Sequence, residues 1–169
     1  YIREIRQMCY VGQDHYKGGR TAAGLMSKLL PEGGDVCVII SSKFLPCHTD
    51  RLKGFRDKLN ELEQKINILE VCENQDLNNV AYRMTLEFCK KYPNLKGLYL
   101  TGGGNEGAAR ALESINMGQR IALICHDLLP EIGKYMRNGT IDFVVDQDAF
   151  RQGYLPVKLL FEKLIKGKN

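Results

Sequence analysis

Residues 98–112, LYLTGGGNEGAARAL, combine a short apolar run, a cluster of glycines and a stretch of small and charged residues. The apolar run is typical of a buried strand, the glycines of a tight turn and the remainder of a helix. Gly102, Gly104 and Gly107 also fit G-x-G-x-x-G, and Asp127 follows about twenty residues later, where a dinucleotide-binding fold places its ribose-binding acid. The segment therefore raises the question of a nucleotide site.

The same alternation of short apolar runs and longer amphipathic stretches extends along the chain. Several runs are apolar on both faces, as buried parallel strands are. The expected strands are residues 8–12, 35–41, 66–72, 95–101, 120–127 and 140–148. This order predicts an α/β fold, a doubly wound parallel sheet with helices on both faces.

Helices are expected between these runs, because apolar residues recur there at spacings of three and four. Asp76 and Asn105 are predicted N-caps, since their side chains can accept from free amides of the first turn. Pro156 is expected to interrupt and kink the last helix.

Length and charge are those of an ordinary globular domain of 169 residues with a net charge of +4. The basic tail 163–169 is interpreted as a solvated helix end rather than a nucleic-acid patch. No run is long enough for a membrane span, and residues 1–10 lack the order of a signal peptide. The sequence begins without Met, so we expect a fragment whose true start is not shown.

Six cysteines occur without C-x-x-C spacing, most of them inside apolar runs. Buried free thiols favour a reducing compartment, which predicts a cytoplasmic protein. His126 follows Cys125 directly, but adjacent strand residues point to opposite faces, so no metal site is predicted. No cofactor is predicted either.

Ligands of such sheets bind beyond the carboxyl ends of the strands. The residues there are polar and suit a hydroxyl-rich small molecule. They comprise Gln13, Asp14, residues 41–51 with His48 among them, Glu73, residues 102–106 with Asn105 among them, His126, Asp127 and residues 146–148.

Enzyme chemistry finds little support in these loops. Ser41, Ser42 and Cys47 follow a strand, but no nucleophile elbow frames them, and His48 cannot be assigned as their base from sequence. We therefore predict no catalytic residue. The glycine loop leaves two interpretations open, a phosphate cradle at a helix N-terminus or a tight strand-to-helix bend.

Five segments in order resemble the C-terminal part of the type I periplasmic-binding-protein fold. They are VGQDHYKGGRTAAGLM (11–26), DRLKGFRDKL (50–59), KGLYLTGGGNEGAARAL (96–112), IALICHDLLPE (121–131) and NGTIDFVVDQDAFRQGYLPVKLL (138–160). Within that superfamily, HDLLPE and GTIDFVVDQD most resemble sugar-responsive transcription regulators of the lac-repressor family. The family often has Asn or Asp early in the loop that is held here by glycines.

The resemblance implies two lobes that close on a sugar. By motif match it assigns ligand contacts to Arg51, Asp127 and Gln147, and His48 and Asn105 complete the predicted binding set. It places residues 14–147 in a C-terminal lobe, and residues 1–13 and 148–169 in elements that return to a mostly absent N-terminal lobe.

The leading hypothesis is therefore the sensing domain of a transcription regulator, with DNA bound through an N-terminal helix-turn-helix that this sequence lacks. The resemblance also implies a homodimer, and no membrane contact is expected. One alternative is an extracytoplasmic solute-binding protein of a sugar ABC transporter. Another is an NAD(P)-dependent enzyme that uses the glycine loop.

Overall fold

The computed structural model describes residues 8–167, and the chain divides into two compact units. The larger unit is His15–Asp146. The smaller unit combines Tyr1–Asp14 with Gln147–Asn169. The chain therefore enters the larger unit once and leaves it once.

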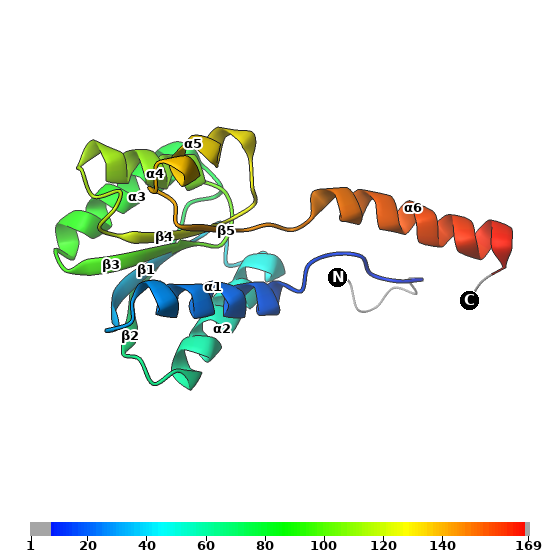
Figure 1. Ribbon diagram of the computed structural model, residues 1–169, viewed down its shortest axis with the longest axis horizontal. Coiled ribbons are helices and arrows are strands. Elements are labelled where there is room, and N and C mark those ends of the chain that lie inside the picture. The colour runs from blue at the N-terminus through cyan, green and yellow to red at the C-terminus, as the bar shows by residue number, and fades with distance from the viewer. Residues whose placement is uncertain (1–7, 168–169) are drawn as a thin grey trace. The chain divides into compact units, whose positions relative to one another are not determined.

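A five-stranded parallel sheet forms the centre of the larger unit, with strand order β2-β1-β3-β4-β5 (Figure 1). The strands are β1 (Gly34–Ile40), β2 (Ile66–Glu73), β3 (Leu95–Leu100), β4 (Ala122–His126) and β5 (Phe143–Val145). Each strand is followed by a helical crossover before the next, as parallel pairing requires. The predicted doubly wound class is confirmed.

Helices cover both faces of the sheet (Figure 1). The helices of the larger unit are α1 (His15–Leu29), α2 (Pro46–Glu61), α3 (Asn78–Lys91), α4 (Asn105–Ser114), the short 3-10 helix η1 (Pro130–Ile132) and α5 (Gly133–Arg137). Helices α1 and α2 pack on one face, whereas α3, α4 and α5 pack on the other.

Alternation along the central strand β1 supplies both cores. Val36 and Val38 belong to the core beneath α1 and α2, and Cys37 and Ile39 to the core beneath α3 and α4. All four side chains are buried, since successive strand residues point to opposite faces and both faces are covered. This is why the run is apolar throughout.

The expected strand at 8–12 is absent, so the sheet has five strands rather than six. Met8 and Tyr10 are exposed. Within residues 8–167, no strand pairs with this run, and an extended segment becomes a strand only when a neighbour satisfies its backbone groups. The apolar composition of residues 8–12 is therefore not sufficient to make them a strand.

Two glycines allow α1 and α2 to touch. A Cβ on Gly19 would lie 1.9 Å from the carbonyl oxygen of Arg51, and one on Gly54 would lie 2.0 Å from the carbonyl oxygen of Tyr16. Only glycine permits so close a backbone approach. The contact also fixes the backbone of Arg51.

The smaller unit contains α6 (Ala149–Lys166), which begins at the N-cap Asp148. The Asp148 side chain accepts a hydrogen bond from the Arg151 amide at 3.1 Å. The helix runs continuously through Pro156, so the expected interruption does not occur. None of its residues is buried, and its exposed apolar side chains are Phe150, Tyr154, Val157, Leu160, Phe161, Leu164 and Ile165. In the described part of the chain, no helix has the length and apolar character needed to cross a membrane.

Candidate functional site

The strand order has its topological switch point between β1 and β3. The chain leaves β1 toward β2 on one side and then returns to β3 on the other, so the loops after β1 and β3 diverge. Such a switch point is where open α/β sheets bind ligands. His48 and Arg51 follow β1, Asn105 follows β3, and Asp127 follows β4.

The backbone carbonyl of Thr101, directly after β3, joins two of the predicted residues. The Arg51 guanidinium donates to this oxygen through Nη1 at 2.6 Å. His48 Nδ1 lies 3.2 Å from the same oxygen and 3.1 Å from Thr101 Oγ1. Arg51 is 2% exposed and His48 6% exposed, so both side chains are buried at this switch point.

Gly102 makes room for the imidazole of His48. A Cβ at this position would lie 2.4 Å from His48 Cε1 and 2.9 Å from Asp76 Oδ1. The glycine is therefore explained by the packing of two neighbouring side chains. No nucleotide is needed to account for it.

Asp76 ties together the loops that follow β1, β2 and β3. Its carboxylate accepts from Ser41 Oγ at 2.7 Å and from the Gly103 amide at 2.6 Å. Asn74 Nδ2 also donates to the carbonyl oxygen of Gly103 at 2.8 Å. The N-cap of α3 is Leu77 rather than the predicted Asp76. The Asp76 carboxylate instead accepts the hydrogen bonds from Ser41 and Gly103.

The glycine loop is a packed bend. Gly104 adopts a φ of 97° and is the N-cap of α4, whereas Asn105, the predicted cap, is the first helical residue. A Cβ on Gly107 would lie 1.9 Å from the carbonyl oxygen of Asn78, so this glycine sets the spacing of α3 and α4. Because Asp76 already brings a carboxylate to the loop, a pyrophosphate there would meet a like charge.

Asn105 points across the edge of the sheet toward β4. Its Nδ2 donates to the carbonyl oxygen of His126 at 2.7 Å, and the side chain is 3% exposed. His126 Nε2 lies 2.8 Å from the Tyr99 hydroxyl. Asn105 Oδ1 and His126 Nδ1 are buried with no hydrogen-bond partner in the described structure. Buried polar atoms of this kind are normally satisfied by water or by a ligand.

All three histidines of the chain lie around Arg51. Burial lowers the pKa of His15, His48 and His126, and the nearby Arg51 charge lowers each further. The pKa of His126 falls to about 3. The three imidazoles are therefore neutral at pH 7. Within residues 8–167, no three His, Cys, Asp or Glu side chains are arranged to hold a metal ion.

Asp127 directly follows β4 and adopts a φ of 68°. Its amide donates to the carbonyl oxygen of Val145 at 3.2 Å. Burial lowers the pKa of His48, and the carboxylates of Asp76 and Asp127 oppose that shift, which places Asp127 within electrostatic range of His48. Arg51 follows β1 and Asp127 follows β4, so the two residues lie on either side of β3 in the strand order.

Gln147 is the first residue of the smaller unit after β5 and Asp146. Its carbonyl oxygen accepts from Gln152 Nε2 at 2.6 Å, which fixes the start of α6. Four of the five predicted ligand residues therefore belong to one edge of the larger unit, and Gln147 belongs to the other unit. Their role in binding stays a prediction.

Sequence reasoning missed the importance of His15, Thr101 and Asp76. His15 begins α1 and is partly buried, with Nδ1 lacking a partner among the described residues. A signal was available, because three histidines all fell near predicted strand ends or the first helix start. Thr101 acts largely through its backbone, for which a sequence gives no signal.

We expect acidification to destabilise the larger unit through His126. A group whose folded pKa is depressed contributes stability above its unfolded pKa of about 6.5, and that stability is lost as the pH falls toward the folded value. Between pH 7 and 4.5, protonation of this one imidazole should lower the free energy of unfolding by about 2.5 kcal/mol. The measurement is urea unfolding at both pH values for the wild type and for His126→Gln.

The variant should lose about 2.5 kcal/mol less on acidification than the wild type. His15 and His48 contribute with the same sign in both proteins, so the difference isolates one group. Equal losses would show that His126 is not held neutral by burial.

Comparison with known proteins places the chain in a family. Residues 2–169 match the family described as Periplasmic binding protein domain. The chain belongs to this family. The resemblance to the type I periplasmic-binding-protein fold, predicted from five segments, is thereby confirmed at the level of the family.

Relatives of this periplasmic binding protein domain have names that refer to sugars. This chain is 24% identical over 162 residues to the xylose/arabinose-binding protein XylF of Sulfolobus acidocaldarius, and the match covers 92% of this chain and 39% of that relative. The crystal structure of GanP, a glucose-galactose binding protein from Geobacillus stearothermophilus, is 26% identical with a TM-score of 0.89, covering 100% of this chain and 60% of that one. AraP, an arabinose binding protein from the same organism, is 25% identical with a TM-score of 0.85, covering 93% and 54%. The chain thus spans between about two fifths and three fifths of these relatives, none of which is named as a lac-repressor-type regulator.

Proposed function

We propose that this periplasmic binding protein domain binds a neutral sugar at the switch point beyond the carboxyl ends of β1 and β3. The observation that carries the proposal is the buried polar cluster in which Arg51 and His48 meet on the Thr101 carbonyl. A planar guanidinium and neutral imidazoles offer paired donors and acceptors, which suit vicinal hydroxyls. Asn105 Oδ1 adds a buried acceptor that has no partner in the described structure.

Charge favours an uncharged ligand. Because the three imidazoles are neutral, Arg51 is the one cation of the predicted binding set, and Asp127 supplies an opposite charge. An acidic sugar would be repelled by Asp127 and Asp76, and an amine would be repelled by Arg51. A polyol avoids both penalties.

In this proposal the two units belong to two lobes, and Gln147 lies where the chain crosses between them. A sugar that contacts both lobes binds the closed form better than the open form, so its binding shifts the population toward closure. The division of residues 14–147 from 1–13 and 148–169 into lobes is part of this proposal.

We assign the whole protein to the solute-binding proteins of sugar transporters rather than to the regulators. The names of XylF, GanP and AraP support this choice, since all are described as sugar-binding proteins. The regulator is the second candidate, supported by the HDLLPE and GTIDFVVDQD segments, and it would require DNA binding and a dimer. A cytoplasmic location, predicted from the free thiols, belongs to that second candidate.

Isothermal titration calorimetry of the full-length protein tests the proposal. Xylose, arabinose, glucose and galactose form the first panel, and NAD and NADP form the second. We expect saturable heat with at least one sugar and none with either dinucleotide, because Asp76 occupies the glycine loop. Saturable heat with a dinucleotide and with none of the sugars would favour the NAD(P)-dependent enzyme over the sugar-binding protein. An electrophoretic shift of DNA by the full-length protein would favour the regulator.

A further inference from the structure

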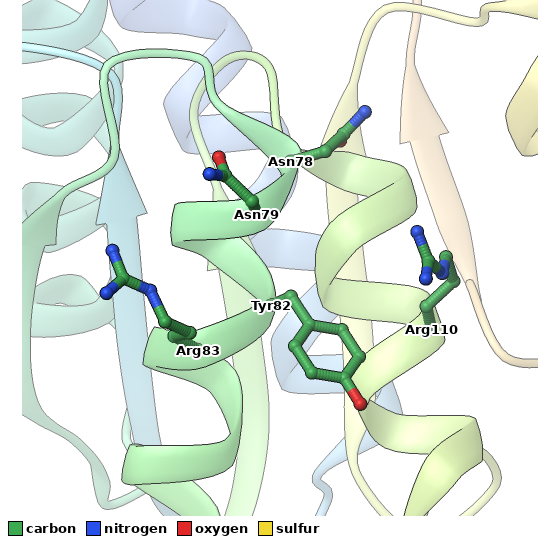
Figure 2. Close-up of a pocket in the computed structure, with 5 residues that line it drawn as sticks. All are labelled: Asn78, Asn79, Tyr82, Arg83 and Arg110. Carbon is green, nitrogen blue, oxygen red and sulfur yellow. The ribbon is translucent and has the colours of Figure 1, made fainter.

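A pocket lies on the outer surface of α3 and α4, with a volume of about 640 Å³. It is lined by Asn78, Asn79, Tyr82 and Arg83 of α3 and by Arg110 of α4. Figure 2 shows Tyr82 between the two helices, with the arginines on either side of it. None of these residues belongs to the predicted sugar site.

The pocket is held in shape by close helix packing. Gly107 brings α4 against the start of α3, and its amide donates to Asn78 Oδ1 at 3.2 Å. Tyr82 donates through its hydroxyl to Ser114 Oγ at 3.3 Å, so its ring is anchored to α4. The Arg110 guanidinium lies 5.7 Å from the centroid of that ring. Asn78 and Tyr82 are therefore already ordered before a ligand binds, which lowers the entropic cost of binding.

The positive charge of the pocket is not neutralised internally. Neither Arg83 nor Arg110 makes an ion pair within the described structure, although Glu87 and Glu106 lie one helical turn away from them. No acidic residue lines the pocket, and the remaining polar groups are uncharged. The pocket therefore offers two exposed guanidinium groups to an anion.

Two exposed apolar residues are adjacent in sequence to residues of α3 and α4 described above, and they favour a protein over a small anion. Leu77, next to Asn78, is 48% exposed, and Ile115, next to Ser114, is 38% exposed. Tyrosine and arginine next to apolar groups form the composition typical of protein interfaces. A free phosphate or carboxylate would leave Leu77 and Ile115 unused.

We propose that this pocket docks an acidic segment of a partner protein, with Asp or Glu side chains on Arg83 and Arg110 and an apolar side chain on Leu77. The partner is a different protein, because this chain carries a net charge of +4 and a second copy would bring like charge. The inference is independent of the sugar proposal, since the two sites share no residue.

Fluorescence anisotropy tests this docking with a fluorescein-labelled peptide, Glu-Glu-Leu-Glu-Glu, added to the full-length protein without sugar. We expect saturable binding that weakens with added salt, and about a tenfold loss of affinity in the double variant Arg83→Gln/Arg110→Gln. The double variant Arg56→Gln/Arg120→Gln is the matched control. It removes the same charge from exposed arginines outside the pocket, and its affinity should stay within about twofold of the wild type.

Three outcomes would overturn the docking proposal. Equal losses in both double variants would mean that only net charge attracts the peptide. Equal binding of the peptide Gln-Gln-Leu-Gln-Gln would show that the carboxylates are not recognised. Displacement of the peptide by inorganic phosphate at matched ionic strength would indicate a small-anion site. Circular dichroism of each variant confirms that the fold is retained.

Discussion

Replacing Arg51 with Ala should lower sugar affinity by about 100-fold or more while leaving the domain folded. The guanidinium is buried at the switch point between β1 and β3, and the proposed contact with sugar hydroxyls consists of charge-assisted hydrogen bonds, which contribute about 1.5–3 kcal/mol each. Calorimetry with the sugar that binds the wild type gives the affinity. Thermal unfolding measures the accompanying loss of stability, for which the lost bond to Thr101 predicts about 1–3 kcal/mol.

Two further variants make the result interpretable. Arg56→Ala removes an exposed arginine from the same helix and should leave affinity within about twofold of the wild type. Arg51→Lys keeps the charge but loses the planar fork, so an intermediate affinity is expected. Retained wild-type affinity in Arg51→Ala would remove Arg51 from the site.

Replacing Gly19 with Ala should destabilise the larger unit by about 2–3 kcal/mol. The added methyl group would lie 1.9 Å from the Arg51 carbonyl oxygen, whereas ordinary contacts begin near 3.4 Å, so α1 and α2 must separate. Because the displaced backbone is that of Arg51, the same variant should also weaken sugar binding. Urea unfolding and calorimetry measure the two effects.

Gly24→Ala provides the control within the same helix. A Cβ at Gly24 would meet nothing within 4 Å, so the substitution brings only the higher helix propensity of alanine. We expect it to stabilise the domain by about 0.5–1 kcal/mol. If Gly19→Ala stabilises the domain equally, the α1–α2 contact is looser than the structure indicates.

The sheet was largely predictable because buried parallel strands are apolar on both faces. Five apolar runs became β1 to β5. The expected helical spacing of three and four is seen in α2, where Leu52, Phe55 and Leu59 are buried. Residues 8–12 have a similar composition, yet they form no strand. Composition reports that a segment prefers burial, but pairing depends on a neighbour that the segment itself does not encode.

The site was predictable only to the level of strand ends. His48, Arg51, Asn105 and Asp127 were found because chain order places them after parallel strands. The carbonyl of Thr101 could not be found this way, since every residue has the same backbone oxygen. The glycine motif was ambiguous for a related reason, because glycine marks close approach whether the neighbour is a phosphate or a side chain.

The Asp76 carboxylate fastens Ser41 to Gly103 and thereby makes three connecting segments mechanically inseparable. Grafting one of these segments from a homologous protein to change the ligand specificity would therefore disturb the other two. Successful exchange of specificity should require transplanting all three together.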